Sequence, residues 1–124
     1  MPAKLNPAQI RDINQQYLPR LSVPDADTLV EASKRRSAKV RDQFACELAL
    51  AYGDTPGQVV DVFPALDKRA PVFIFIHGGY WRARDLNRQT YSHVAKPFVR
   101  AGATVVLPDY DLCPDARLTD IVNQ

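Results

Sequence analysis

A ten-residue stretch, Val72–Trp81, constrains the fold more than any other part of this chain. It runs Val-Phe-Ile-Phe-Ile-His-Gly-Gly-Tyr-Trp, and its first five apolar residues predict a strand buried on both faces. Gly78 and Gly79 follow at the strand end, where glycine permits positive φ and lets backbone N–H groups approach a ligand. Unpaired N–H groups at such a turn can stabilise the negative oxygen that forms when a carbonyl is attacked. The simpler alternative is a strand that merely ends in a glycine turn.

Length and composition narrow the class of protein. With 124 residues, 46% of them hydrophobic, the chain is long enough for one domain with a core and too short for two. The net charge is only +2, and the basic run Lys34–Arg36 lacks interleaved aromatic residues, so we expect no nucleic-acid partner. Cys46 and Cys113 lack metal-site spacing and suit a reducing cytoplasm, although one disulfide stays open. Without a signal peptide in residues 1–20 or a long apolar span, the sequence predicts a cytoplasmic protein without membrane contact.

The N-terminal third has helical signals. Asn6 followed by Pro7 predicts a helix start, with a capping side chain and then proline at the first helical position. A second helix is predicted to begin near residues 25–27, with Thr28 and Glu31 forming a capping box. Its apolar stripe is weak, so we expect this helix to be peripheral.

The rest of the chain alternates strands with one helix. Residues 47–52 and 58–63 predict two strands joined by a short turn, which should pair antiparallel. After the strand at Val72–Ile76, the pattern predicts a helix over 87–101, bent at Pro97, and a buried strand over 103–107. A strand, a helix and a strand with these connections imply a right-handed parallel crossover.

This order of elements resembles the first half of the α/β-hydrolase fold. Within that fold, His77–Trp81 is similar to the HGGXW signature of the arylformamidase (kynurenine formamidase) group and its esterase relatives. The run Pro108–Pro114, followed by Leu118, also resembles that group. The resemblance covers residues 45–124, so it predicts an incomplete α/β-hydrolase domain there, preceded by an N-terminal helical segment over residues 1–44. No metal or cofactor is implied, because no histidine, cysteine or carboxylate cluster has the spacing of metal ligands.

The resemblance assigns roles to the loop residues. In such enzymes the glycine backbone at the strand end supplies half of the oxyanion hole. Carried over, the amides of Gly78, Gly79 and Tyr80 would face the carbonyl oxygen of the substrate. Tyr80 and Trp81 are candidate substrate-binding residues, although packing is an alternative for both and the favoured one for Trp81. We interpret His77 as a structural residue of the motif whose ring bonds local backbone.

The nucleophile that this fold requires is absent from the sequence. Hydrolysis needs a serine in a Gly-x-Ser-x-Gly elbow, then an acid, then a histidine. None of the four serines has the flanking glycines: Ser22, Ser33, Ser37 and Ser92. His93 falls on the polar side of the predicted helix, and we expect it to be solvated.

These observations leave two hypotheses. In the first, the chain is the N-terminal part of a serine hydrolase that acts on a formamide resembling N-formylkynurenine or on a small carboxylic ester, and it is inactive alone. In the second, it is a truncated, non-catalytic α/β protein whose open sheet edge pairs with a partner chain, either a second copy or a complementary fragment. At this point the sequence does not decide whether the substrate is a formamide or an ester. It also does not decide whether the chain is a true short protein or a truncated gene product.

Overall fold

The computed structural model describes residues 4–124 and divides the chain into two compact units. The second unit begins at Ala32, so the boundary falls in the sequence of α3 (Ala26–Gln43). Residues 1–3 of the predicted helical segment lie outside the described part. The division at residues 44 and 45 stays a prediction about domains, because compactness alone places the boundary earlier.

The first unit contains α1 (Pro7–Tyr17) and α2 (Pro19–Ser22). The predicted start of α1 is confirmed, because the Asn6 side chain accepts a hydrogen bond from the Gln9 N–H at 2.9 Å. The predicted capping box of the next helix is wrong. The N–H of Leu29 already donates to the carbonyl of Asp25, so Thr28 lies inside the first turn of α3 rather than before it.

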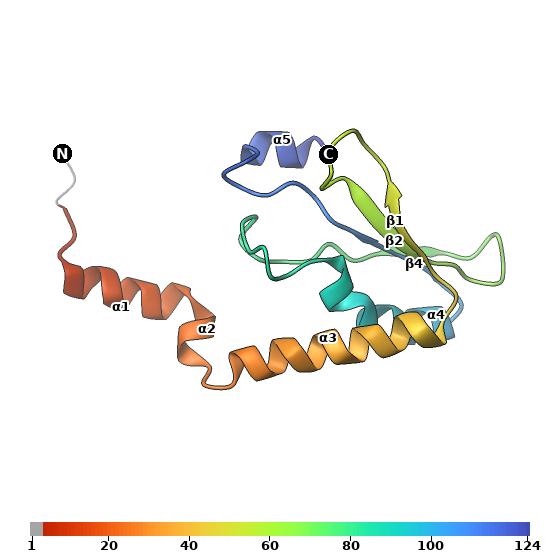
Figure 1. The fold of residues 1–124 in the computed structure, drawn as a ribbon, viewed down its shortest axis with the longest axis horizontal. Coiled ribbons are helices and arrows are strands. Elements are labelled where there is room, and N and C mark those ends of the chain that lie inside the picture. Colours follow the sequence, from red (N-terminus) through yellow and green to blue (C-terminus); the bar gives the residue numbers. More distant parts are fainter. Residues whose placement is uncertain (1–3) are drawn as a thin grey trace. The chain divides into compact units, whose positions relative to one another are not determined.

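The second unit is built on a four-stranded sheet (Figure 1). Its strand order is β1-β2-β4-β3, with two antiparallel pairs and a parallel β3–β4 pair. The predicted hairpin and the predicted parallel strand–helix–strand unit are both confirmed. The strands are β1 (Glu47–Ala51), β2 (Val59–Phe63), β3 (Val72–Ile74) and β4 (Thr104–Pro108). β3 is two residues shorter than predicted, but the Phe75 N–H still donates to the Val106 carbonyl at 3.0 Å.

The crossover consists of two short helices instead of one bent helix. A 3-10 helix, η1 (Arg88–Val94), passes directly into α4 (Ala95–Arg100). Pro97 therefore lies in the first turn of α4, where its missing N–H leaves no helical bond unmade. Gly102 ends α4 with φ +90°, which agrees with its prediction as the C-terminal cap.

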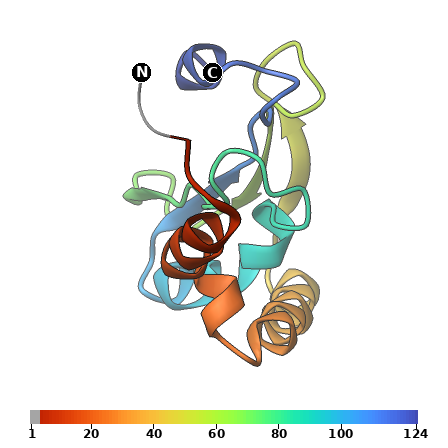
Figure 2. The ribbon, with the colours of Figure 1, turned by 90° about the vertical axis from the view of Figure 1, so that its left-hand side faces the viewer.

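The core lies between the sheet and the helices. Phe63, Val105 and Leu107 of the sheet are completely buried and pack with Val40 of α3 and Ala95 of α4. Both helices cover the same side of the sheet, as Figures 1 and 2 show. The prediction that the second helix would be peripheral holds for most of α3, since Ser37 and Val40 are its buried residues, although Val40 does join the core.

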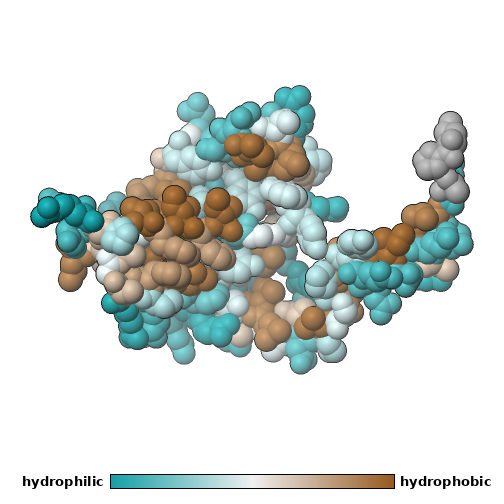
Figure 3. Space-filling view, turned by 180° about the vertical axis from the view of Figure 1, so that it is seen from behind, coloured by the Kyte–Doolittle hydropathy of each residue, from teal (hydrophilic) through white to brown (hydrophobic). Residues whose placement is uncertain are grey.

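The opposite side of the sheet is largely uncovered. Val72, Ile74 and Ile76 are 60%, 58% and 67% exposed. Within residues 32–124, the short helix α5 (Leu118–Val122) lies on that side, with Ile121 buried. Apolar residues gather at the surface in the view from behind (Figure 3). We call Val72, Ile74 and Ile76 the β3 edge, because β3 pairs with β4 on one side only.

Two smaller expectations are also resolved. Cys46 and Cys113 are both free thiols, so the disulfide that the sequence left open is absent. Among the helices of residues 4–124, none combines the length and apolar character that a membrane crossing needs.

Candidate active site

The loop after β3 turns sharply at three successive residues. Gly79 has φ +131°, and Tyr80 and Trp81 have φ +53° and +54°. Left-handed backbone costs a residue with a Cβ roughly 1–2 kcal/mol, so the surroundings must hold this turn. The N–H groups of Arg82 and Ala83 donate to the Gly79 carbonyl at 3.0 and 2.9 Å. The Cys113 N–H donates to the Trp81 carbonyl at 2.7 Å, which ties the loop to the segment after β4.

Two of the predicted donors are not used by the loop itself. Within residues 4–124, the N–H groups of Gly78 and Gly79 have no hydrogen-bond acceptor. A Cβ placed on Gly78 would meet nothing within 4 Å, so the space in front of it is open. Both glycines line a hollow of about 300 Å³ at the end of β3. Their amides are therefore available to an oxygen atom of a ligand.

His77 is buried beneath this loop, with 4% of its surface exposed. Its Nδ1 lies 2.9 Å from the Gly78 carbonyl oxygen, and its Nε2 lies 3.1 Å from Oδ1 of Asp109. The ring stacks on Tyr110, with ring centroids 4.7 Å apart, and the Tyr110 hydroxyl donates to the His77 carbonyl at 2.6 Å. The ring thus bonds local backbone, as expected of a structural histidine, and also a carboxylate that the sequence analysis did not single out.

Asp109 is the residue that joins the loop to the crossover. Oδ1 accepts from the Arg88 backbone N–H at 2.7 Å, and Oδ2 bonds the Arg88 guanidinium. Burial by itself would raise the pKa of Asp109, but the hydrogen bonds from His77 and Arg88 outweigh it and lower the pKa. One sequence signal was available: Asp109 directly follows a buried strand, and the carboxyl ends of parallel strands meet at one edge of a sheet.

Arg88 extends the network into the sheet. Its Nε donates to Oδ1 of Asp61 at 2.7 Å, and Asp61 is completely buried at the centre of β2. The Ala49 N–H donates to the same oxygen at 2.8 Å, at the irregular step of β1, while Oδ2 has no partner among the described residues. Burial opposes the charge of Arg88, but its bonds to Asp61 and Asp109 raise its pKa above the usual value.

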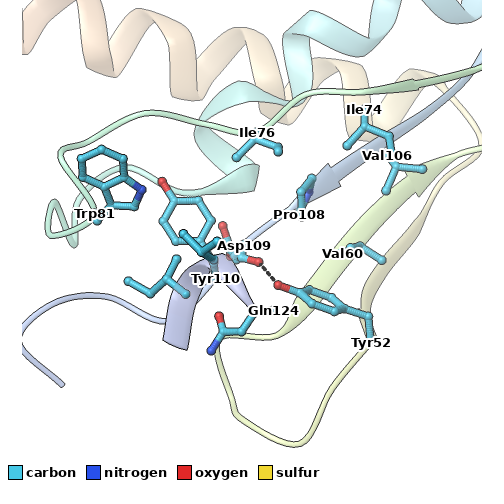
Figure 4. A pocket seen from close by; sticks show the side chains of 12 residues that line it. Tyr52, Val60, Ile74, Ile76, Trp81, Val106, Pro108, Asp109, Tyr110 and Gln124 are labelled. Atoms are coloured by element: carbon cyan, nitrogen blue, oxygen red, sulfur yellow. Dashed lines mark hydrogen bonds between the residues drawn. The ribbon is translucent and has the colours of Figure 1, made fainter. Parts of the chain in front are cut away.

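A second, apolar hollow of about 430 Å³ adjoins the loop (Figure 4). Trp81 and Tyr110 line both hollows, and the Tyr52 hydroxyl donates to the Asp109 carbonyl at its rim. Trp81 is 49% exposed and borders both hollows, and its role in packing or in substrate binding stays a prediction. The lining residues are Tyr52, Val60, Ile74, Ile76, Trp81, Val106, Pro108, Asp109, Tyr110, Ile121, Val122 and Gln124.

The prediction that His93 is solvated is wrong. Its Nδ1 lies 3.0 Å from Oγ of Ser37 on α3, and the same Oγ accepts from the His93 backbone N–H. Burial, and then the charge of Arg36, lower the pKa of His93. Ser37 is fully buried and donates its proton to the Thr90 carbonyl at 2.7 Å, so this pair joins α3 to η1 and is not a nucleophile with its base.

Comparison with known proteins places this geometry in context. No protein-family model matches the chain. It is 39% identical over 77 residues to kynurenine formamidase of Drosophila melanogaster, a match that covers 60% of the chain and 25% of that protein. It is 31% identical over 114 residues to kynurenine formamidase of Salmo salar, covering 88% and 37% respectively. The chain therefore spans well under half the length of the curated relatives it matches.

Solved structures decide the fold. A protein from Silicibacter sp. TM1040 that is proposed to be a thioesterase superposes with a TM-score of 0.77 at 27% identity, over 85% of this chain and 40% of that one. The sheet is the N-terminal half of an α/β-hydrolase fold. Esterase B of Lactobacillus rhamnosis shares this hydrolase fold at 22% identity, with a TM-score of 0.61 over 90% of this chain and 36% of that one. In this sheet, His77–Trp81 lies where β3 ends, next to the end of β4.

Proposed function

We propose that this chain supplies the oxyanion hole of a serine hydrolase that acts on a formamide resembling N-formylkynurenine or on a small carboxylic ester. The observation that supports it most directly is the pair of unpartnered amides at Gly78 and Gly79, which line an open hollow. The names of the relatives, kynurenine formamidase and esterase, indicate hydrolysis of a carbonyl compound.

In this mechanism, the amides of Gly78, Gly79 and Tyr80 donate to the oxygen that becomes negative in the tetrahedral intermediate. Donors fixed before the reaction stabilise that charge without rearrangement, and one such donor contributes on the order of a hundred- to a thousand-fold in rate. Tyr80 and Trp81 border the same hollow and would contact the substrate beside its carbonyl group.

The attacking serine, its base and the acid would come from outside these 124 residues. Ser37 and Ser92 are completely buried, and Ser22 and Ser33 lie in α2 and α3, so none forms a nucleophile elbow. We therefore expect the chain alone to be inactive, since the nucleophile and base supply the larger part of the rate enhancement.

A chimera tests this proposal. The 77 matched residues of the Drosophila melanogaster enzyme are replaced by those of this chain, and hydrolysis of N-formylkynurenine and of p-nitrophenyl acetate is measured. We expect activity on at least one substrate, and the ratio of kcat/KM values separates formamide from ester preference. A folded chimera with neither activity would contradict the proposal, and the unmodified fly enzyme serves as the positive control.

The β3 edge supports a second candidate function. Its three apolar side chains are more than half exposed, and an exposed apolar edge strand readily pairs with another chain. In this alternative the chain is a non-catalytic protein that binds a second copy or a complementary fragment through β3. Size-exclusion chromatography of the 124-residue chain tests self-pairing: a discrete dimer supports it, and a stable monomer contradicts it.

A further inference from the structure

Both ring nitrogens of His77 face oxygen atoms that only accept hydrogen bonds. Nδ1 is 2.9 Å from the Gly78 carbonyl, and Nε2 is 3.1 Å from the Asp109 carboxylate. A neutral imidazole has one N–H and one lone pair, so a neutral ring would set its lone pair against one of these oxygens. We infer that His77 is a doubly protonated imidazolium, and that this charged ring is the positioning residue of the amide loop.

With both carboxylates ionised, the neighbouring charges balance when His77 is protonated. His77, Asp109, Arg88 and Asp61 form one connected chain of ion pairs, with side chains 3%, 14%, 12% and 0% exposed. With an imidazolium, two positive groups face two carboxylates. With a neutral ring, the cluster would hold an uncompensated negative charge in a nearly dry site, which is strongly unfavourable.

The remaining groups around the ring also suit a cation. The Tyr110 ring stacks on His77 and that of Tyr91 in η1 lies nearly parallel to it, at centroid distances of 4.7 and 6.1 Å. Aromatic faces attract a positive charge through their quadrupole. Burial, and then the charge of Asp109, raise the pKa of Tyr110, so its hydroxyl stays neutral and continues to donate to the His77 carbonyl.

The Nδ1 contact determines which way an amide points. In a planar trans peptide, the carbonyl of one residue and the N–H of the next point in opposite directions. When the ring holds the Gly78 carbonyl, the Gly79 N–H is therefore turned away from the ring. That N–H is one of the two unpartnered donors of the loop. His77 thus acts through Gly79, and this catalytic consequence rests on the proposed function, whereas the protonation state does not.

Nitrogen-15 NMR of the ring nitrogens in the 124-residue chain tests the protonation state. The chain has only one other histidine, His93, whose pKa is lowered, so it provides a neutral reference near pH 7 in the same sample. His93→Gln assigns the two sets of signals. We expect both nitrogens of His77 to be protonated when His93 carries one proton. A neutral His77 in the unmodified chain overturns the inference, whatever the hydrolase assay gives.

Removing the counter-charge is the second arm. Asp109→Asn keeps the size of the side chain but not its charge, so His77 should lose one ring proton near pH 7. An unchanged imidazolium in a folded Asp109→Asn chain would show that Asp109 does not hold the charge. If this variant does not fold, the spectrum of the unmodified chain decides the matter alone.

Two substitutions in the chimera separate positioning from packing. His77→Asn keeps an N–H donor near the Nδ1 position, facing Gly78, while His77→Gln keeps one near the Nε2 position, facing Asp109. We expect His77→Asn to lower kcat by less than about tenfold and His77→Gln by about a hundredfold, with KM nearly unchanged in both. The reverse order would refute the positioning role. An inactive parent chimera instead contradicts the proposed function and leaves the NMR result standing.

Discussion

Gly78 and Gly79 are adjacent but meet different demands. Gly79 needs a left-handed φ of +131°, and a Cβ there would lie 2.9 Å from the Cβ of Ala83. Gly78 lies outside the left-handed region, and a Cβ there would enter open space. The backbone conformation therefore requires glycine at position 79. At position 78 the absence of a Cβ leaves space in front of the backbone that a ligand can occupy.

We predict that Gly79→Ala lowers the free energy of unfolding by about 1–3 kcal/mol, because its backbone is strained and its Cβ clashes. Gly78→Ala should leave thermal unfolding unchanged but lower kcat/KM of the chimera by about a hundredfold, since the methyl group blocks the oxyanion position. Thermal melting and ester hydrolysis, measured on both variants, check this. A fully active Gly78→Ala chimera would show that the carbonyl oxygen binds elsewhere.

His93 predicts how stability depends on pH. Burial lowers its pKa from 6.5 in the folded chain, so the unfolded chain takes up a proton first as the pH falls. The contribution of His93 to the free energy of unfolding should therefore decrease on acidification below about pH 6.5, before Asp109 begins to lose its contribution below about pH 4. Urea unfolding of the unmodified chain and of His93→Gln near pH 7 and pH 5.5 isolates this contribution, because the other titrating groups, His77 included, are common to both chains. On acidification the unmodified chain should lose more stability, or gain less, than His93→Gln, and parallel curves would contradict the assignment.

At the scale of elements, the sequence predicted those helices and strands whose formation depends on residues close together in the chain. The apolar run before His77 and the alternating hairpin strands were recognisable because burial and turn chemistry act within a few residues. The 3-10 form of η1 was not predicted, and it is bonded by a residue far away in the sequence: Ser37 of α3 donates to the Thr90 carbonyl and accepts from the His93 N–H. The glycine loop was likewise predicted from its own sequence.

The ion-pair network could not be predicted in the same way. Asp61, Arg88 and Asp109 come from β2, η1 and the end of β4, three elements that only the tertiary fold brings together. A strand aspartate such as Asp61 has no local signal that separates it from a solvent-facing residue. Knowledge of the β2–β4 register would have been needed, because that pairing sets Asp61 opposite Leu107 and close to Asp109.

Arg88 is predicted to be the element-scale link on which stability depends. Arg88→Met leaves Asp61 and Asp109 buried without their shared cation, so the free energy of unfolding should fall by about 3–5 kcal/mol. Urea unfolding measures this change. Arg69→Met, at an exposed turn residue, is the matched control and should change stability by less than about 0.5 kcal/mol. Equal effects of the two substitutions would mean that the network contributes nothing.

For the whole molecule, the main feature is the unequal cover of the sheet. Helices α3 and α4 bury one face, while the β3 edge stays more than half exposed. The sequence predicted a buried strand here because parallel sheets normally bury their apolar strands on both faces. The prediction of burial on both faces is wrong for the described residues, because Val72, Ile74 and Ile76 are more than half exposed on the outer face of the sheet.

We predict that the β3 edge dominates self-association of the chain. Ile74→Lys places a charge on the edge strand and should reduce the associated fraction seen by light scattering, with little loss of stability because Ile74 is already 58% exposed. Leu66→Lys is the control, since Leu66 is fully exposed in the loop before β3. If both variants associate like the unmodified chain, another surface is responsible.

The strand order has a consequence for how the protein is made. β4 lies between β2 and β3 in the sheet, although it follows both of them in the sequence. The hairpin of β1 and β2 can form early. β2 gains its second neighbour only when Phe63 pairs with Val105 of β4, and β3 gains its first neighbour only when Val72 pairs with Thr104. During synthesis, one edge of β2 and one edge of β3 are thus unpaired, and nascent-chain binding factors can reach them until β4 inserts between the two strands.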